Sequence, residues 1–252
     1  MIPTLGRSNK QISFDNLAKF LQDKTTLVVQ PHEKDLYPNY PTLVLPEDNI
    51  GISRTRKFIY DYCHGDIFAM MDDDIKVQRR RKDARPLKVD PTIDEWKQLI
   101  DTHLEWLDNG FSFTSLMQGS APPRKKDIQD NTAVYGFVFY GKDIPKSDEL
   151  IWNHDLLAED VNLHLQLLLK GYKNRVSLNY CCEQKSYAEG GCSSLRTLEM
   201  MDKSHKYLIE QYPEVVKWDC SKGKQQYSVN KKSPGWKKIN IFWNRASKLG
   251  DK

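Results

Sequence analysis

Three consecutive carboxylates, Asp72, Asp73 and Asp74, directly follow the apolar run "IFAMM". Adjacent carboxylates repel one another, and a hard divalent cation with oxygen ligands would offset their charge. The usual partner of such a cation is a diphosphate, whose charge the cation also neutralises. Acids are common in solvated turns as well, so the triplet by itself is compatible both with a site and with a plain turn.

A second pair of acids, Glu159 and Asp160, opens the amphipathic stretch "EDVNLHLQLLLKGY". A carboxylate within hydrogen-bond reach of a hydroxyl group can take its proton as a general base. Acids in the first turn of a helix also interact favourably with the helix dipole, which is a purely structural explanation. The pair therefore gains a catalytic interpretation only in combination with the triplet.

Basic residues concentrate in three segments, the first of them beside the triplet. They are Arg79, Arg80, Arg81, Lys82 and Arg85 in the first, Arg124, Lys125 and Lys126 in the second, and the Lys and Arg residues of 218–252 in the third. The third also holds Trp236, Phe242 and Trp243. Cationic surfaces attract phosphate backbones, and aromatic side chains stack on exposed bases. A single basic run is usually a solvated face, but three favour a nucleic-acid partner.

The acids need elements that position them, and the first 75 residues predict such a scaffold. Apolar strand-like runs alternate there with helical patterns, which is typical of parallel βαβ units. Ligands bind at the carboxyl ends of such strands, which is where the triplet falls. The predicted strands are 1–8, 25–30, 41–46, 66–73, 111–117, 132–141 and 175–184. The predicted helices are 13–23, 53–64, 91–110, 156–172 and 194–212, and the charged segment 76–92 is predicted to be a loop.

The composition is that of a folded chain, with 252 residues, 39% hydrophobic, and a formal net charge of +4. This length suits one sizeable α/β core. The five Cys include no CxxC pair, and Cys181 and Cys182 are adjacent, which favours reduced thiols over a disulfide framework. No apolar run approaches the roughly 20 residues of a membrane span, and residues 1–10 lack a signal core. We therefore expect a cytoplasmic protein with no membrane contact.

The segment "NIGISRTRKFIYDYCHGDIFAMMDDD" resembles the end of the nucleotide-binding half of GT-A glycosyltransferases, particularly the large inverting family 2. Asn49 and Gly51 match the Asn-x-Gly turn of that family. Arg56 matches the Arg of the Ala-Arg-Asn tripeptide of the family, whose Ala and Asn are replaced in this chain. Asp72 and Asp74 match its Asp-x-Asp motif. In the family this motif holds a manganese or magnesium ion against the diphosphate of a nucleotide sugar.

The resemblance implies an α/β protein of the GT-A fold, Rossmann-like, with a mixed, mainly parallel sheet flanked by helices. Residues 1–217 would form a single catalytic domain, with a donor half at 1–75 and an acceptor half at 76–217. Residues 218–252 would be a basic, aromatic C-terminal extension. Asp72 and Asp74 would bind the metal, and the donor would be a nucleotide-diphosphate sugar, with a UDP-sugar expected.

Further site residues follow from the same resemblance. The expected donor-binding residues are Pro3, Thr4, Arg7, Glu33, Arg54, Arg56, Asp72, Asp73 and Arg196. Glu33 stands near the place where family 2 enzymes carry an Asp that contacts the base. Arg196 follows a Gly pair that could approach a phosphate, although that segment also suits a helix N-cap.

The acid pair 159–160 resembles the Glu-Asp helix of the family, which ends in Gly-Tyr. By this resemblance Asp160 is the catalytic base and Glu159 its neighbour, which implies inversion at the anomeric carbon. A retaining reaction remains open. Many GT-A enzymes add a late His to the metal, and the late His residues of this chain are His154, His164 and His205.

The "PHE" after the second strand, "GISRTRKFI" and the Asp triplet are similar to bacteriophage DNA-modifying glycosyltransferases of the TET-associated group. These enzymes place sugars on hydroxymethylated bases, typically 5-hydroxymethylcytosine, in double-stranded DNA, which shields phage DNA from host nucleases. The three basic segments would then bind DNA. The alternatives are a polysaccharide, lipid or protein acceptor, a metal-dependent nuclease or nucleotidyltransferase, and a basic binding domain without activity.

Overall fold

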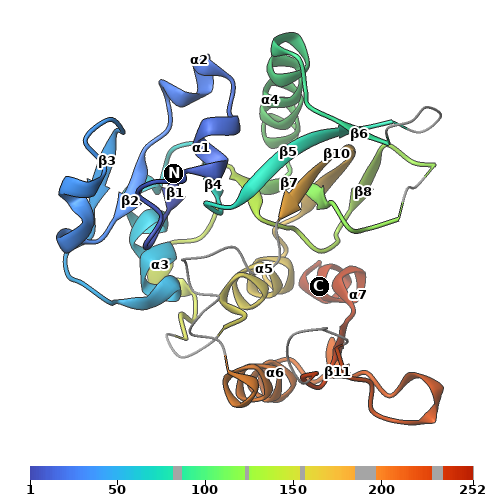
Figure 1. The fold of residues 1–252 in the computed structure, drawn as a ribbon. Coiled ribbons are helices and arrows are strands. Elements are labelled where there is room, and N and C mark those ends of the chain that lie inside the picture. The colour runs from blue at the N-terminus through green and yellow to red at the C-terminus, as the bar shows by residue number, and fades with distance from the viewer. Residues whose placement is uncertain (82–86, 123–124, 154–156, 185–196, 229–234, 252) are drawn as a thin grey trace.

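A parallel three-stranded sheet forms the N-terminal edge of the molecule (Figure 1). The computed structural model describes residues 1–81, 87–122, 125–153, 157–184, 197–228 and 235–251. The strands of this sheet are β1 (Ile2–Pro3), β2 (Leu27–Val29) and β3 (Thr42–Val44), in that order. The amino group of Met1 donates to the carbonyl of Ala69 at 2.8 Å, and the amide of Met71 donates to the carbonyl of Met1 at 3.1 Å. These bonds join the small sheet to the larger one, edge to edge.

Within the described residues, the larger sheet has seven strands and continues the first one. They are β4 (Phe68–Met71), β5 (Ile75–Arg80), β6 (Lys88–Val89), β7 (Phe113–Gln118), β8 (Ile128–Asp130), β9 (Phe137–Tyr140) and β10 (Asn174–Gln184). The order is β4-β9-β7-β10-β5-β6, and β8 pairs with β10. Among the described strands of this sheet, only β7 and β10 pair in parallel. The larger sheet is therefore mixed and its described pairs are mostly antiparallel, whereas the three-stranded sheet of the N-terminal segment is parallel.

Helices cover both faces of the sheet. They are α1 (Ile12–Asn16), α2 (Lys19–Gln22), α3 (Gly51–Cys63), α4 (Ile93–Asp108), α5 (Glu159–Leu169), α6 (Leu198–Gln211), α7 (Trp243–Gly250) and the short turns η1 (Pro31–Leu36), η2 (Ser147–Glu149) and η4 (Ser221–Gly223). Ile59 of α3 and Leu165 of α5 belong to one buried cluster, and Trp96 and Leu99 of α4 to another. Figure 1 shows α4 and α5 on opposite sides of the sheet. None of the described helices is both long and apolar enough to cross a membrane.

Most predicted elements are present near the expected bounds, and the helix ends follow local chemistry. The Thr92 hydroxyl accepts from the amide of Glu95, and the Glu95 carboxylate accepts from the amide of Thr92, which is a capping box at the start of α4. Gly110 and Gly171, after α4 and α5, have φ of 91° and 88°, a conformation that favours glycine. These helices are the ones whose sequence patterns are strongest.

The prediction of a loop over 76–92 is wrong, because this segment contains the strands β5 and β6. Ile75 and Val77 are buried, and Lys76 and Gln78 between and after them are half-buried. This alternation is the period of a strand with one face in the core. The high charge of the segment and its two prolines, Pro86 and Pro91, favour a loop instead and so hide this alternation. The predicted helix 13–23 is likewise two short helices, α1 and α2, separated at Leu17 by an extended backbone with ψ of 146°.

The C-terminal segment folds back onto the rest of the chain. Strand β11 (Val216–Trp218) pairs with β12 (Ile239–Ile241), and α7 packs against α5. Ala246 is fully buried in the cluster shared with α3 and α5. The predicted boundary between 217 and 218 falls inside β11, and the division into a domain and an extension stays a prediction.

Gly250→Ala is expected to lower the free energy of unfolding by about 1–3 kcal/mol, the usual cost of overpacking. A Cβ at Gly250 would collide with the backbone carbonyl of Leu168 and lie 2.6 Å from the amide of Gly171. Thermal unfolding followed by circular dichroism measures the effect. Lys248→Ala, at an exposed position of the same helix, is the control. Equal midpoints of thermal unfolding for the two variants would contradict the close packing of α7 against α5.

Candidate active site

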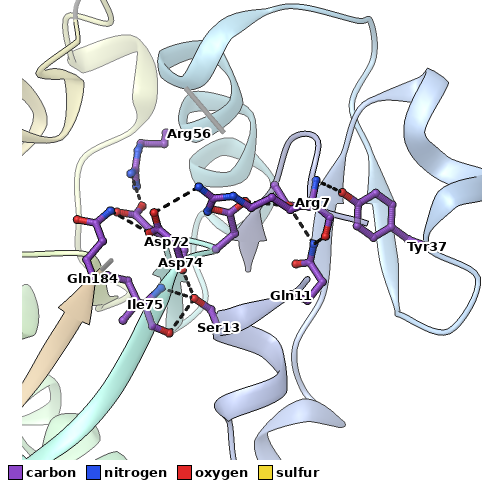
Figure 2. A network of polar contacts seen from close by, with 11 residues as sticks. Arg7, Gln11, Ser13, Tyr37, Arg56, Asp72, Asp74, Ile75 and Gln184 are labelled. Atoms are coloured by element: carbon purple, nitrogen blue, oxygen red, sulfur yellow. Dashed lines mark hydrogen bonds and ion pairs between the residues drawn. The ribbon is translucent and has the colours of Figure 1, made fainter. Parts of the chain in front are cut away.

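The Asp triplet forms the turn between β4 and β5, at the carboxyl end of a buried strand (Figure 2). Ser13 of α1 fixes this turn. Its amide donates to the carbonyl of Asp73 at 3.2 Å, and its hydroxyl accepts from the amide of Ile75 at 2.8 Å. The amide of Asp72 donates to the carbonyl of Gly136 at 2.8 Å. The three carboxylates are thus held at the edge where the two sheets meet.

The middle carboxylate, Asp73, is buried and saturated by protein partners. Its Oδ1 forms an ion pair with Arg7, and its Oδ2 accepts from the Thr4 hydroxyl at 2.9 Å. Burial raises the pKa of Asp73 to about 7, against the opposing effect of Arg7. The amide of Gly6 donates to Glu33 at 2.6 Å, which helps to hold the loop that carries Arg7. Asp73 therefore serves to anchor that loop.

The outer carboxylates, Asp72 and Asp74, have different partners. Arg56 of α3 donates to Oδ1 of Asp72 at 2.6 Å, and Gln184 at the end of β10 donates to Oδ1 of Asp74 at 2.8 Å (Figure 2). Arg7 also lies 3.4 Å from Oδ2 of Asp74. Burial raises the pKa of Asp74, and Gln184 and Arg7 oppose the shift. Each outer acid thus keeps one oxygen that is weakly engaged.

Arg56 also connects the triplet to the second acid pair. Its Nε donates to Glu159 at 3.0 Å while its Nη2 binds Asp72, so a single guanidinium bridges α5 and the triplet. Burial raises the pKa of Glu159 to about 7, Asp160 adds to the shift and Arg56 opposes it. Asp160 is half-buried, and its Oδ1 accepts from the amide of Val161 at 2.8 Å.

These groups line one cleft of about 210 Å³. Its described lining residues are Pro3, Thr4, Leu5, Arg7, Gln30, Leu45, Asn49, Gly51, Ile52, Thr55, Arg56, Asp72, Asp73, Asp74, Glu159 and Gln184. Four carboxylates face two guanidinium groups there, so the wall has an excess of formal negative charge. Asp160 is not among the described lining residues. The cleft therefore brings Glu159, the triplet and two arginines together.

Most of the predicted donor-binding residues lie in this cleft. They are Pro3, Thr4, Arg7, Arg56, Asp72 and Asp73. Glu33 is buried behind the Gly6 loop, and Arg54 is more than half exposed and lies 4.0 Å from Glu47, so the structure brings neither to the cleft wall among the described residues. Arg196 lies outside the described residues. The binding roles themselves stay predictions.

Sequence reasoning missed polar residues that also form the cleft. The sequence predicts Gln184 only as the end of a strand, yet its side chain donates to Asp74, 110 positions earlier in the chain. Gln30 accepts from the amide of Asn49 at 2.7 Å, which ties the end of β2 to the turn before α3. Asn49 has a φ of 57°, uncommon outside glycine, and this positive φ fits its place in a turn. No local pattern pointed to Gln184, because only the sheet pairing brings it close.

The predicted metal ligands Asp72 and Asp74 fit a hard divalent cation. Oδ2 of Asp72 accepts no hydrogen bond from the described residues, and Oδ2 of Asp74 has only the long contact with Arg7. Within the described ranges, no three His, Cys, Asp or Glu side chains form a cluster that could hold a metal. Two carboxylates combined with diphosphate oxygens and water are the coordination that Mg²⁺ commonly adopts.

The late His residues that the structure describes have other partners. His164 is buried, and its Nε2 lies 2.9 Å from the hydroxyl of Tyr140. The Nδ1 atom of His205 lies 2.7 Å from the carbonyl oxygen of Lys237. Burial lowers the pKa of His164 to about 3, so it stays neutral. Both are packing residues here, and His154 lies outside the described residues.

The predicted DNA-binding arginines of the first basic segment alternate between the two faces of the sheet. Arg79 forms an ion pair with Glu95 of α4 at 2.7 Å. Arg80 points to the other face, where it contacts Met117 and donates to the carbonyl of Ala121 at 2.6 Å. Arg81, Lys125 and Lys126 lie at or near the surface, while Lys82, Arg85 and Arg124 are outside the described residues. DNA binding by this set stays a prediction.

The two sheets and the helices that cover them define the fold class of the protein, which is the GT-A fold. A Staphylococcus aureus TarS structure (residues 1–349, in complex with UDP-GlcNAc) superposes with a TM-score of 0.51 at 13% identity. The match covers 82% of this chain and 65% of that one, and it supports the fold alone. The predicted GT-A fold is confirmed.

The sequence comparison then gives the family. Residues 1–191 match the family model described as TET-Associated Glycosyltransferase, so the chain belongs to that family. A β-glucosyl-HMC-α-glucosyl-transferase of enterobacteria phage T2 is 26% identical over 238 residues, which cover 88% of this chain and 84% of the relative. The phage T6 protein of the same name is 25% identical with the same coverage. The predicted family resemblance is confirmed.

Proposed function

We propose that this glycosyltransferase moves a sugar from a nucleotide-diphosphate sugar to the hydroxymethyl group of 5-hydroxymethylcytosine in double-stranded DNA. The observation that carries the proposal is the cleft in which the Asp triplet, Arg56 and Glu159 meet in a chain of this family. The names of the phage T2 and T6 relatives support an HMC acceptor. The UDP-GlcNAc complex of the TarS structure is consistent with a UDP-sugar donor.

The acid pair supplies the proton acceptor for the hydroxyl group of the acceptor. Glu159 lines the cleft, whereas family resemblance gives the base role to Asp160. We propose that Glu159 removes the proton, since a general base must lie within hydrogen-bond reach of the hydroxyl. Arg56 holds its carboxylate in place and connects it to Asp72. An attack in line with the departing diphosphate would invert the anomeric carbon.

A divalent metal, Mn²⁺ or Mg²⁺, is proposed on Asp72 and Asp74. When bound, it would stabilise the negative charge of the leaving diphosphate. Arg7 is close to this position, because it lies beside both Asp73 and Asp74. It would help to orient the diphosphate and to limit repulsion between the carboxylates.

A second acceptor of the same chemical kind is a hydroxymethylcytosine that already carries glucose. The names of the phage T2 and T6 relatives favour it, since they contain a glucosyl-HMC unit. The nucleophile would then be a sugar hydroxyl, and the same base would serve. In either case we propose that the modification protects phage DNA from host nucleases, in the host cytoplasm.

The proposal is tested by mass spectrometry of nucleosides from duplex DNA incubated with the enzyme, Mn²⁺ or Mg²⁺ and a panel of nucleotide sugars. The DNA carries cytosine, hydroxymethylcytosine or glucosylated hydroxymethylcytosine. A hexose or pentose mass increment on one modified base, and none on cytosine, names donor and acceptor together. No increment with any donor or DNA, while a polysaccharide or protein becomes labelled, would refute the DNA acceptor. Cleavage of the DNA without a nucleotide sugar would favour a nuclease.

The rate of transfer is expected to rise with pH through about 7. Burial places the pKa of Glu159 near 7, so below that pH the carboxyl group is protonated and cannot accept the proton of the acceptor. A profile of kcat against pH from 5.5 to 8.5 measures this rise at saturating donor and DNA. Donor affinity, measured in parallel, is the control for effects on the triplet. A flat profile would contradict the base role of Glu159.

A further inference from the structure

A second groove is lined by residues of α4 and of the strands β5, β8 and β10. Figure 1 shows where these elements lie in the fold. Its volume of about 620 Å³ lies within the range typical of ligand sites. Its described lining residues are Arg79, Arg80, Arg81, Glu95, Gln98, Leu99, Thr102, His103, Trp106, Asp127, Ile128, Ser177, Asn179 and Tyr180. The donor cleft shares none of these residues. The groove is therefore a separate feature of the molecule.

Strand alternation decides which arginine of the groove can bind a ligand. The guanidinium of Arg79 is paired with Glu95, so these two charges cancel. The guanidinium of Arg80 is turned to the opposite face of the sheet. Arg81 is half-buried at the groove, and none of the described residues forms an ion pair with it. Asp127 is the second acid of the lining, so the groove suits one phosphate at Arg81 better than a dense polyanion.

The neutral lining residues have the chemistry of a nucleic-acid backbone site. Gln98, Thr102, Asn179 and Tyr180 belong to the residue types that hydrogen-bond phosphate and sugar oxygens in protein–DNA complexes. All four are at least partly accessible. Beneath them lies His103, which is buried and whose Nε2 has no hydrogen-bond partner among the described residues. Buried polar atoms rarely lack a hydrogen-bond partner, so this Nε2 atom distinguishes the bottom of the groove from an ordinary packed core.

The sheet register fixes the spacing between the groove and the donor cleft. Arg79 pairs with Tyr180, and four positions back Ile75 pairs with Gln184, which binds Asp74. Five residues of strand separate Asp74 from Arg79, which is about 17 Å at roughly 3.4 Å per residue. One strand of B-DNA advances about 3.4 Å per nucleotide. The groove therefore begins about five nucleotides from the triplet, and Arg81, two residues beyond Arg79, lies about seven nucleotides from it.

We propose that this groove binds the sugar–phosphate backbone of the acceptor DNA, with a phosphate on Arg81 about seven nucleotides from the modified base. The groove contributes affinity and sets the register of the DNA, and it takes no part in the chemical step. This inference rests on the proposed DNA acceptor.

The test measures the affinity of fluorescent hydroxymethylcytosine duplexes by anisotropy at several salt concentrations. Arg81→Ala is expected to weaken binding about tenfold, the loss of one charge-assisted contact, and to reduce the salt slope by about one. Thr102→Trp fills the groove without changing the charge and is expected to weaken binding as well, and Gln98→Glu is a second groove variant. Lys97→Ala, an exposed α4 position outside the groove lining, is the matched control for lost charge.

Kinetic measurements and duplexes of different length distinguish the role of the groove in DNA binding from the role of the catalytic site. The groove variants are expected to raise KM for DNA and to leave kcat unchanged. Shortening the duplex to two base pairs on one side of the modified base is expected to abolish the difference between wild type and Arg81→Ala. If wild type modifies DNA but the groove variants bind like Lys97→Ala, the groove inference alone fails. The same holds if only Arg81→Ala weakens binding, because Arg81 would then act outside the groove. If wild type neither binds nor modifies DNA, the proposed acceptor fails with it.

Discussion

Glu159→Gln is expected to lower kcat for sugar transfer by about 10²–10⁴-fold, the usual contribution of a general base. The amide of glutamine keeps an oxygen that can accept from Arg56, so the contact between α5 and α3 survives while the proton acceptor is lost. Because the change is isosteric, the donor cleft should keep its shape. Single-turnover transfer at saturating DNA and donor measures the chemical step directly.

Asp160→Asn is the matched control for that experiment. It is also isosteric, it lies one residue away, and its Oδ1 can still accept from the amide of Val161. We expect it to lower kcat less than about tenfold, because Asp160 is not among the described residues that line the cleft. It should also keep the rise of activity near pH 7, which Glu159→Gln should lose. The reverse ranking of the two variants would return the base role to Asp160, as the family resemblance implies.

Asp72→Asn is expected to reduce sugar transfer, whereas Asp73→Asn is expected to reduce the stability of the fold, although the two residues are neighbours. Asp72 is the more exposed acid, with 28% of its side chain accessible against 11% for Asp73. Its replacement should reduce transfer at least about 100-fold, since a metal on a leaving group contributes several kcal/mol. Its unfolding free energy should change little. Titration of Mn²⁺ into wild type and variant measures the loss of metal dependence.

Asp73→Asn should instead destabilise the fold. It leaves Arg7, whose side chain is only 4% exposed, without its main counter-ion. Breaking one side of a buried ion pair costs about 3–5 kcal/mol. Urea unfolding at pH 8, where Asp73 is ionised, measures this cost. If Asp73→Asn were stable and Asp72→Asn unfolded, the division of the triplet into an anchor and metal ligands would be wrong.

The local patterns of the sequence were enough for the scaffold and for the position of the acids. The apolar run before Asp72 predicts a buried strand, and a buried strand places the acids at its carboxyl end. The strong periodicity of α4 and α5, and the glycines that follow them, predict those helices within a few residues. These features depend on neighbours in the chain, so a linear pattern contains them.

The alternating pattern of residues 75–80 is also present in the sequence, although the segment is predicted to be a loop. Ile75 and Val77 alternate with polar residues, yet the high charge of the segment suggested a loop. Once it is a strand, adjacent side chains must point to opposite faces. Arg79 and Arg80 therefore cannot contact the same phosphate backbone, which a run of three arginines in a loop could have done.

Only the tertiary structure decided which groups meet the acids. Arg7, Arg56 and Gln184 reach the triplet from 66, 16 and 110 positions away, and their partners depend on how α3, β10 and the first loop are packed. The same packing turns Glu159 toward the cleft. The sequence by itself determined that acids and cations would gather at this edge of the sheet. The pairing between them depends on distances through space, which local periodicity does not encode.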